Sequence, residues 1–154
     1  MNNKNNHQNN DIIQIKEIHK CDYNLMELCI DAAKKSNMRS KHGCVIIDNK
    51  GRLISSACNK RKNLKDEHID DELMRRKKGF SKHAEETALK NVNRDKLKGA
   101  KLYVVRWGYA DGCPFHFLNS KPCVKCTAII NACINNYGLK GAYYSTDINK
   151  CIPI

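Results

Sequence analysis

Two segments, each at the start of a predicted helix, most constrain how this chain of 154 residues can fold. One is SKHAEETALK at residues 81–90, which places His83 and Glu85 two positions apart at the helix start. Residues i and i+2 do not share a face of a helix, so an amphipathic helix has no use for them as a pair. At a helix N-terminus both side chains can still reach one site. The pair therefore predicts a functional site at the end of this helix.

The second segment is SKPCVKCTAII at residues 120–130, where Cys123 and Cys126 have the spacing C-x-x-C. The proline before them suits the start of a helix, and the positive end of the helix dipole favours thiolates there. Two thiolates at this spacing form half of a zinc site. With His83 as the third ligand, Zn²⁺ keeps one position for water, and Glu85 is close enough to exchange that water's proton.

A different zinc site remains open in the same region. Cys113 and His116 precede the cysteine pair in CPFHFLNSKPCVKC, with the spacing C-x2-H-x6-C-x2-C. That arrangement predicts a small structural zinc knuckle, which would leave His83 free and close the position kept for water. Cys113 and His116 could also hold a second zinc ion.

The pattern H-A-E at 83–85 and P-C-x-x-C at 122–126 resembles the zinc signature of the cytidine/deoxycytidylate deaminase superfamily. The resemblance extends from about residue 22 to residue 146. It implies an α/β fold, specifically a cytidine deaminase-like three-layer α/β/α sandwich with a mixed central sheet. It also implies a hydrolase that removes ammonia from a cyclic amidine, with Glu85 as the group that transfers protons.

The resemblance also implies substrate contacts. Asn59 falls where such enzymes place a substrate-binding asparagine, and the backbone around Ala84 and Lys121 would hold the edges of the base. Two further contacts come from position alone. Tyr144 alternates with Tyr143 along the last predicted strand, so one of the two can face the substrate. Arg61 belongs to a basic set beside the predicted hairpin that could meet a phosphate: Arg39, Lys41, Lys60 and Arg61.

Hydrophobic periodicity predicts helices at 22–36, 83–92 and 123–137, a hairpin within 43–59, and strands at 101–107 and 141–146. Residues 59–80 are predicted to be a long loop with a helical turn, and residues 108–121 are predicted to be a loop. Strand–helix–strand units with short links predict parallel neighbours and helices on both faces of the sheet. Four cysteines within apolar patterns are predicted to be core residues: Cys29, Cys44, Cys58 and Cys133.

Composition limits the setting in which the protein works. Residues 1–20 are rich in asparagine and are expected to be a disordered tail, followed by one zinc-binding domain at 21–154. Nine cysteines, an odd number, and no signal-like apolar region favour a reducing cytoplasm with free thiols. No run of about 18 apolar residues occurs, so no membrane partner is expected.

The net charge of +12, with 28 basic and 16 acidic residues, favours a phosphate-bearing partner. A histidine as the first ligand resembles the nucleotide, nucleic-acid and guanine branches of the superfamily. Among these, a small-molecule nucleotide, dCMP or CMP, is the favoured substrate. A tRNA or RNA deaminase and a guanine deaminase-like enzyme are the alternatives, although aromatic residues for base stacking make up only 6% of the chain. A catalytically inactive zinc-stabilised binding module is a further alternative, against which Glu85 argues.

A homo-oligomer is also expected. Only eight residues, 147–154, follow the last predicted strand, and they can add at most a short strand to the sheet. A long edge left bare is normally covered, and a second subunit is the simplest cover. The basic loop at 59–80 could then reach a neighbouring active site.

Overall fold

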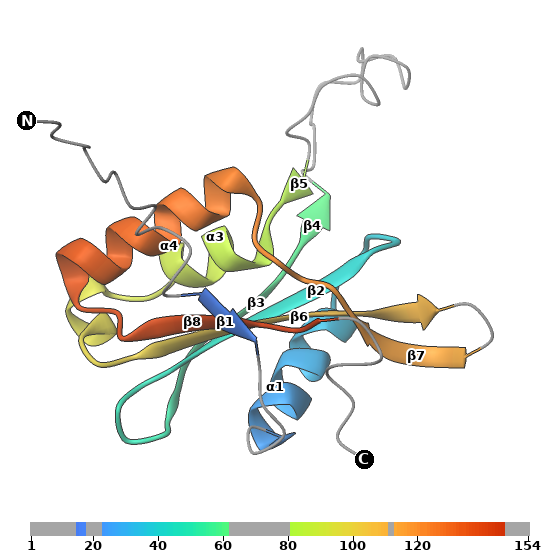
Figure 1. Ribbon diagram of the computed structural model, residues 1–154, viewed down its shortest axis with the longest axis horizontal. Helices are drawn as coiled ribbons and strands as arrows, with labels where there is room; N and C mark the ends of the chain where they lie inside the picture. The colour runs from blue at the N-terminus through green and yellow to red at the C-terminus, as the bar shows by residue number, and fades with distance from the viewer. Residues whose placement is uncertain (1–14, 18–22, 62–80, 111–112, 147–154) are drawn as a thin grey trace, which may run out of the picture.

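The computed structural model describes residues 15–17, 23–61, 81–110 and 113–146. In this part of the chain a mixed sheet forms the middle of three layers. Helix α1 (Tyr23–Lys34) covers one face, while α3 (Ala84–Lys90) and α4 (Val124–Tyr137) cover the other (Figure 1). The predicted three-layer α/β/α sandwich is therefore confirmed.

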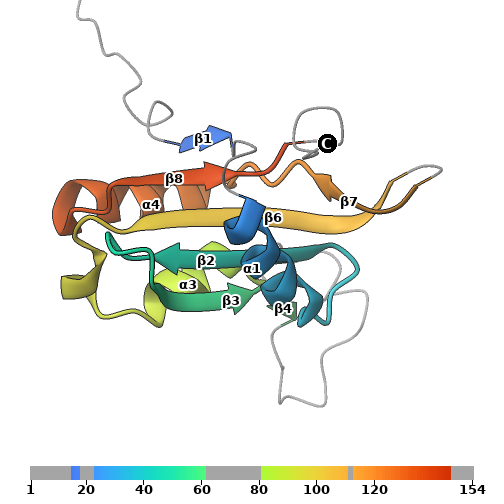
Figure 2. The same ribbon diagram turned by 90° about the horizontal axis from the view of Figure 1, so that it is seen from below.

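The strands of the sheet follow the order β1 (Ile15–Glu17), β8 (Gly141–Tyr144), β6 (Lys101–Ala110), β2 (Lys41–Ile47) and β3 (Leu53–Cys58). Figure 2 shows the last four of these side by side. Strand β8 runs parallel to both β6 and β1, whereas the β6–β2 and β2–β3 pairs are antiparallel. A separate ribbon pairs β4 (Lys60–Arg61) with β5 (Ser81–Lys82).

Apolar side chains divide between the two faces according to the two-residue period of the strands. Cys44 and Ile46 of β2, with Leu102 and Val104 of β6, pack under α3 and α4. The residues between them on the same strands pack under α1. The four cysteines predicted to be core residues are all buried, as are the inward positions predicted for α3: Ala84, Ala88, Leu89 and Val92.

Two glycines explain local features of this packing. A Cβ atom at Gly43 would lie 2.0 Å from the carbonyl oxygen of Cys29, so only glycine allows α1 to approach β2 this closely. Gly138 has a φ of 73° and ends α4, as predicted, because glycine adopts this left-handed conformation at little cost.

Two predictions about the strands are wrong. Residues 108–121 do not form the predicted loop, because β6 continues to Ala110 and pairs with β7 (Cys113–Leu118). The Asp-Gly pair at 111–112 is typical of a hairpin turn, and turn-forming residues suit a tight turn as well as a longer loop. Strands β3 and β6, joined through α3, are not parallel neighbours, because β2 lies between them.

The outer edge of β8 is occupied by β1, which consists of residues 15–17 of the expected N-terminal tail. The remainder of the tail, the loop residues 62–80 and residues 147–154 lie outside the described residues. A bare β8 edge was the reason to expect a homo-oligomer, and β1 removes that reason. Oligomerisation itself stays a prediction. No helix within the described ranges is long and apolar enough to span a membrane.

Candidate metal centre and active site

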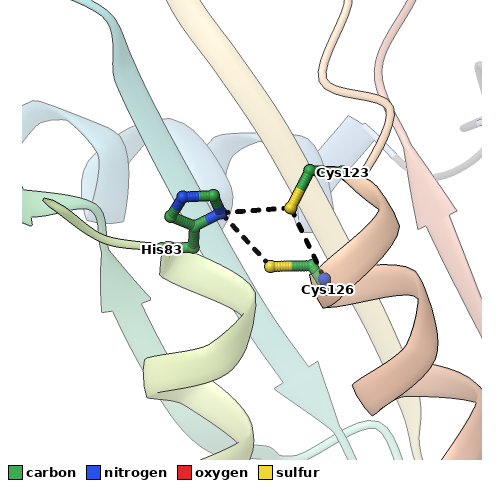
Figure 3. A group of neighbouring side chains, drawn as sticks. All are labelled: His83, Cys123 and Cys126. Carbon is green, nitrogen blue, oxygen red and sulfur yellow. Dashed lines mark hydrogen bonds between the residues drawn. The ribbon is translucent and has the colours of Figure 1, made fainter. Parts of the chain in front are cut away.

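The metal-binding side chains come from two helix N-termini at the same end of the sheet. His83 is the residue before α3, and Cys123 is the residue before α4. His83 is the N-cap residue of α3, and its carbonyl oxygen accepts the N–H of Thr87 at 3.1 Å, but its side chain makes no capping hydrogen bond. Its imidazole ring is thus free to face the two cysteines (Figure 3).

The three side chains have the spacing expected of zinc ligands. Nδ1 of His83 lies 3.5 Å from Sγ of Cys123 and 3.3 Å from Sγ of Cys126. All three ligand atoms lie within 4.8 Å of one another. With zinc–sulfur bonds of about 2.3 Å and zinc–nitrogen bonds of about 2.0 Å, tetrahedral nitrogen and sulfur ligands stand about 3.6 Å apart. The donor set therefore fits zinc as it stands.

The surroundings of the cysteines favour a cation between them. Burial, and then the negative charge of Glu85, raise the pKa of the Cys126 thiol. Both effects favour the neutral thiol over the thiolate. A divalent cation bound at the sulfur would favour the thiolate instead, so the thiolate form and the cation stabilise each other. The Sγ atom of Cys123 also accepts the backbone N–H of Cys126 at 3.5 Å, which orients it at the helix start.

A cavity of about 270 Å³ opens beside these ligands. It lies between the start of α3, the segment before α4 and the ends of β2 and β3. Its walls are formed by Met38, Ser40, His42, Asn59, Ser81, His83, Ala84, Glu85, Ser120, Lys121 and Cys123. Four residues assigned to catalysis or substrate binding from the sequence thus line one cavity with two of the metal ligands: Glu85, Asn59, Ala84 and Lys121.

Glu85 is the acidic residue of this cavity. Its side chain is only 5% exposed, although it belongs to the first turn of α3. Burial raises the pKa of its carboxyl group, while a hydrogen bond from its own backbone N–H and the nearby His83 partly oppose that shift. A raised pKa makes a carboxyl group a better proton acceptor, which suits general acid–base catalysis.

Asn59 lines the cavity, but its amide group is occupied by the segment that leads into β2. Its Oδ1 accepts the backbone N–H of His42 at 2.8 Å and the hydroxyl of Ser36 at 2.7 Å. Its Nδ2 donates to the carbonyl oxygen of Ser40 at 2.7 Å. In this structure Asn59 therefore fixes the shape of the cavity wall.

The segment before Cys123 is fixed to the sheet by Ser120. Its hydroxyl donates to the carbonyl oxygen of Val104 at 2.9 Å and lies 2.8 Å from the hydroxyl of Ser145. The backbone N–H of Ser120 also donates to the carbonyl oxygen of Ser145 at 2.9 Å. Lys121 follows, and its N–H donates to the side chain of Asn119 at 2.9 Å. These bonds hold the cysteine pair at the end of β6 and β8.

Two residues assigned to substrate binding are not among those lining the cavity. Tyr144 packs against the core beneath α3 and α4. Arg61 is exposed on β4, where its backbone N–H donates to the side chain of Asn37 at 3.0 Å. Lys41, of the same basic set, donates to the carbonyl oxygen of Ser36.

His42 has no role assigned from the sequence, although it lines the cavity. Burial, and then the charge of Arg106, lower its pKa to about 4, so its ring is neutral at pH 7. Only the register of β2 with β6, which places His42 opposite Arg106, brings these residues together. The sequence signal available was the two-residue alternation of β2, which puts His42 on the same face as Cys44.

The rival zinc arrangement was based on Cys113 and His116. The backbone of both residues belongs to β7, and their side chains lie outside the described residues. The structure instead places Cys123 and Cys126 against His83, as the first interpretation expects.

Comparison with protein families decides where the chain belongs. The family model for the cytidine and deoxycytidylate deaminase zinc-binding region matches residues 19–138, which is most of the chain. The chain belongs to this family. As a member of this zinc-binding deaminase family it carries a His83/Cys123/Cys126 group able to bind zinc, and the family's reaction is hydrolysis of a C–N bond.

A solved structure with a TM-score above 0.5 shows the same fold at low sequence identity. The dCMP deaminase from the cyanophage S-TIM5, in complex with dCMP and dUMP, is 19% identical, with a TM-score of 0.52 and coverage of 82% of each chain. The cytidine deaminase from Burkholderia pseudomallei is 18% identical, with a TM-score of 0.46 and coverage of 70% of this chain and 72% of that one. No match was found among curated protein sequences.

Proposed function

We propose that this member of the deaminase family is a zinc-dependent hydrolase that converts a cytosine nucleotide, dCMP or CMP, into the uracil nucleotide and ammonia. One observation carries the proposal. A buried carboxyl group, Glu85, shares a cavity with a His83/Cys123/Cys126 group whose spacing fits zinc. A structural zinc site needs neither a buried carboxyl group nor a cavity beside it.

The residues of the site would have different roles in the reaction. His83, Cys123 and Cys126 would hold zinc, which supplies a Lewis acid that lowers the pKa of water to about 7. Glu85 is not one of these three ligands, so its Oε atoms are available to carry a proton. In zinc deaminases a carboxylate of this kind acts as general acid and base. Here it would take one proton from water and deliver it to the ring nitrogen of cytosine, and would then pass the second proton of that water to the amine, which leaves as ammonia.

The backbone of the cavity wall can hold the base. Ala84 is the first residue of α3, and the first N–H groups of a helix have no acceptor within the helix. Such an N–H is available to a carbonyl oxygen of the base. Lys121 also lines the cavity, and its carbonyl oxygen can accept an N–H of the exocyclic amine. Asn59 would act by positioning His42 and Ser40, as its hydrogen bonds indicate.

The dimensions and charge of the site favour a small anionic substrate. The cavity of about 270 Å³ is near the lower end of the usual range for ligand sites, which suits a single pyrimidine nucleotide. The chain also carries a net charge of +12, and electrostatic attraction raises the local concentration of phosphorylated ligands.

The test is ammonia release by the zinc-loaded protein from a panel of dCMP, CMP, deoxycytidine, cytidine, guanine and tRNA. We expect turnover of dCMP or CMP with the highest kcat/KM. Highest activity on guanine or tRNA would replace the proposed substrate while keeping the deaminase chemistry.

The matched pair of variants is Glu85→Gln and Glu86→Gln. Glu86 is the next residue of α3, does not line the cavity and forms an exposed ion pair with Lys125 at 3.4 Å. We expect Glu85→Gln to lower turnover by about 10⁴-fold and Glu86→Gln to retain it. No ammonia from any compound of the panel, at full zinc occupancy, would leave only a zinc-stabilised binding protein.

A further inference from the structure

Arg106 has an arrangement that the proposed reaction leaves unexplained. It lies on β6, on the face of the sheet that carries Leu102 and Val104 and therefore the active site. Its side chain is half-buried and its Nε atom is fully buried with no hydrogen-bond partner among the described residues. A buried donor without a partner costs free energy, so an acceptor that arrives with a ligand would recover that cost.

Strand register places this arginine beside the cavity. Arg106 lies directly opposite His42 in the antiparallel β2–β6 pair. The N–H and C=O groups of His42 bond to Asn59 on the other side of β2, so His42 and Arg106 form a non-hydrogen-bonded pair. Side chains of such pairs approach each other most closely, at about 4.5–5.5 Å between Cβ atoms.

Within the described part of the chain, no second carboxylate lies in the cavity wall to balance the charge of this arginine. Among the residues that line the cavity with His42, one is acidic, Glu85, and its proposed role is proton transfer beside the zinc ligands. The groups that affect the pKa of His42 are Arg106, His83 and the backbone of Ser40. An arginine whose Nε–H has no partner among the described residues, next to a histidine ring with one N–H donor, matches the oxygens of a phosphate group.

We propose that Arg106, assisted by His42, binds the phosphate group of the substrate, so that the enzyme selects a cytosine nucleoside monophosphate over the free nucleoside. This inference rests on the proposed function for the identity of the base, and it names the group that recognises the rest of the substrate. It takes the place of Arg61 as the proposed phosphate contact, because Arg106 lies opposite the cavity-lining His42, whereas Arg61 is exposed on β4.

The experiment measures binding rather than turnover, so that it is independent of the chemical step. UMP and uridine, which have no amine to lose, are titrated calorimetrically into the zinc-loaded protein. We expect UMP to bind about 10- to 100-fold more tightly than uridine, the usual value of hydrogen bonds to a charged group. Equal affinity for UMP and uridine would overturn the proposal.

Variants then assign this preference to Arg106. Arg106→Gln is expected to remove the preference for UMP and leave uridine affinity unchanged, whereas Arg106→Lys keeps part of it because the charge remains without the planar fork. Arg52→Gln is the matched control, since Arg52 is exposed at the β2–β3 turn and pairs with Asp48. A loss of uridine affinity equal to that of UMP in Arg106→Gln would mean a structural role and contradict the proposal.

The result also separates this inference from the proposed function. If the UMP preference depends on Arg106 but no cytosine compound is deaminated, the phosphate site stands and the proposed function fails. The opposite outcome is that CMP is deaminated, but Arg106→Gln changes neither the KM for CMP nor the affinity of the protein for UMP. In that case the proposed function stands and the phosphate site is wrong. Should Arg106→Gln not fold, the Arg106→Lys protein and the wild-type comparison of UMP with uridine decide alone.

Discussion

The two ends of the active-site cavity are built in different ways. The metal end consists of His83, Glu85, Cys123 and Cys126, which all lie at or next to the first turns of α3 and α4. The sheet end consists of His42 of β2 and Asn59, the residue after β3, and Arg106 of β6 lies opposite His42. The metal end is set by spacing within short segments, and the sheet end is set by strand register. In the proposed reaction the first would carry the chemistry, and the second would shape what can bind.

This difference explains what could be predicted from the sequence. H-A-E and P-C-x-x-C each specify a local geometry, so the sequence alone predicts all four residues of the metal end. His42 and Arg106 are far apart in the chain and only their opposition in the β2–β6 pair makes them neighbours. No local spacing indicates such a pair.

The same reasoning applies to the fold. Strongly periodic segments predict α1, α3, α4, the β2–β3 hairpin and β8 close to their observed bounds. The sequence does not predict the β6–β7 hairpin, because Gly108, Pro114 and the Asp-Gly pair are as typical of a long loop as of a hairpin. The pairing of β1 with β8 escapes it because three residues in a polar segment carry almost no pattern. Which strands pair, and which strand forms the edge of the sheet, depends on the sheet as a whole and not on any one segment.

The largest expected effect comes from removing a ligand at the metal end. Cys123→Ser is expected to lose zinc and, with it, all measurable deamination, because serine is a poor replacement for a thiolate ligand. Elemental analysis of the purified variant measures the zinc content. Cys133→Ser, on the same helix but in the core, is the control and should keep its zinc. A fully zinc-loaded Cys123→Ser protein would show that the metal is held elsewhere.

The next largest effect separates chemistry from metal binding. Glu85→Gln should keep the fold and the zinc, since the amide is of equal size, but lower kcat by about 10⁴-fold because it cannot carry a proton. Steady-state kinetics on dCMP, with zinc content measured in the same sample, provide the test. Turnover near the wild-type rate would remove Glu85 from the mechanism.

At the sheet end, Asn59→Ala is expected to act on stability and substrate affinity together. It removes the acceptor of the His42 N–H and the donor to the Ser40 carbonyl oxygen, leaving both part-buried groups without this partner. We expect a loss of about 2–4 kcal/mol in the free energy of unfolding and a raised KM with zinc retained. Urea denaturation measures the first quantity. Asn136→Ala, exposed near the end of α4, is the control, and equal behaviour of the two variants would contradict this role.

The smallest effect is expected at Arg61. Because this residue is exposed on β4 and does not line the cavity, Arg61→Ala should change kcat/KM by less than about threefold, the range of weak surface electrostatics. A larger loss would indicate that Arg61 reaches the active site of a second subunit. Mixing Arg61→Ala and Glu85→Gln chains would then restore activity, and light scattering at micromolar concentration would show an oligomer.

The central claim is that the metal end performs zinc-dependent deamination of a cytosine nucleotide. The most direct measurement is ammonia release from dCMP and CMP by one preparation in three states: as purified, after chelation of its zinc, and after zinc is restored. The account predicts activity in the first state, none in the second and recovery in the third, in proportion to zinc bound per chain. Undiminished turnover by the zinc-free protein, or no turnover of either nucleotide at full zinc occupancy, would contradict it.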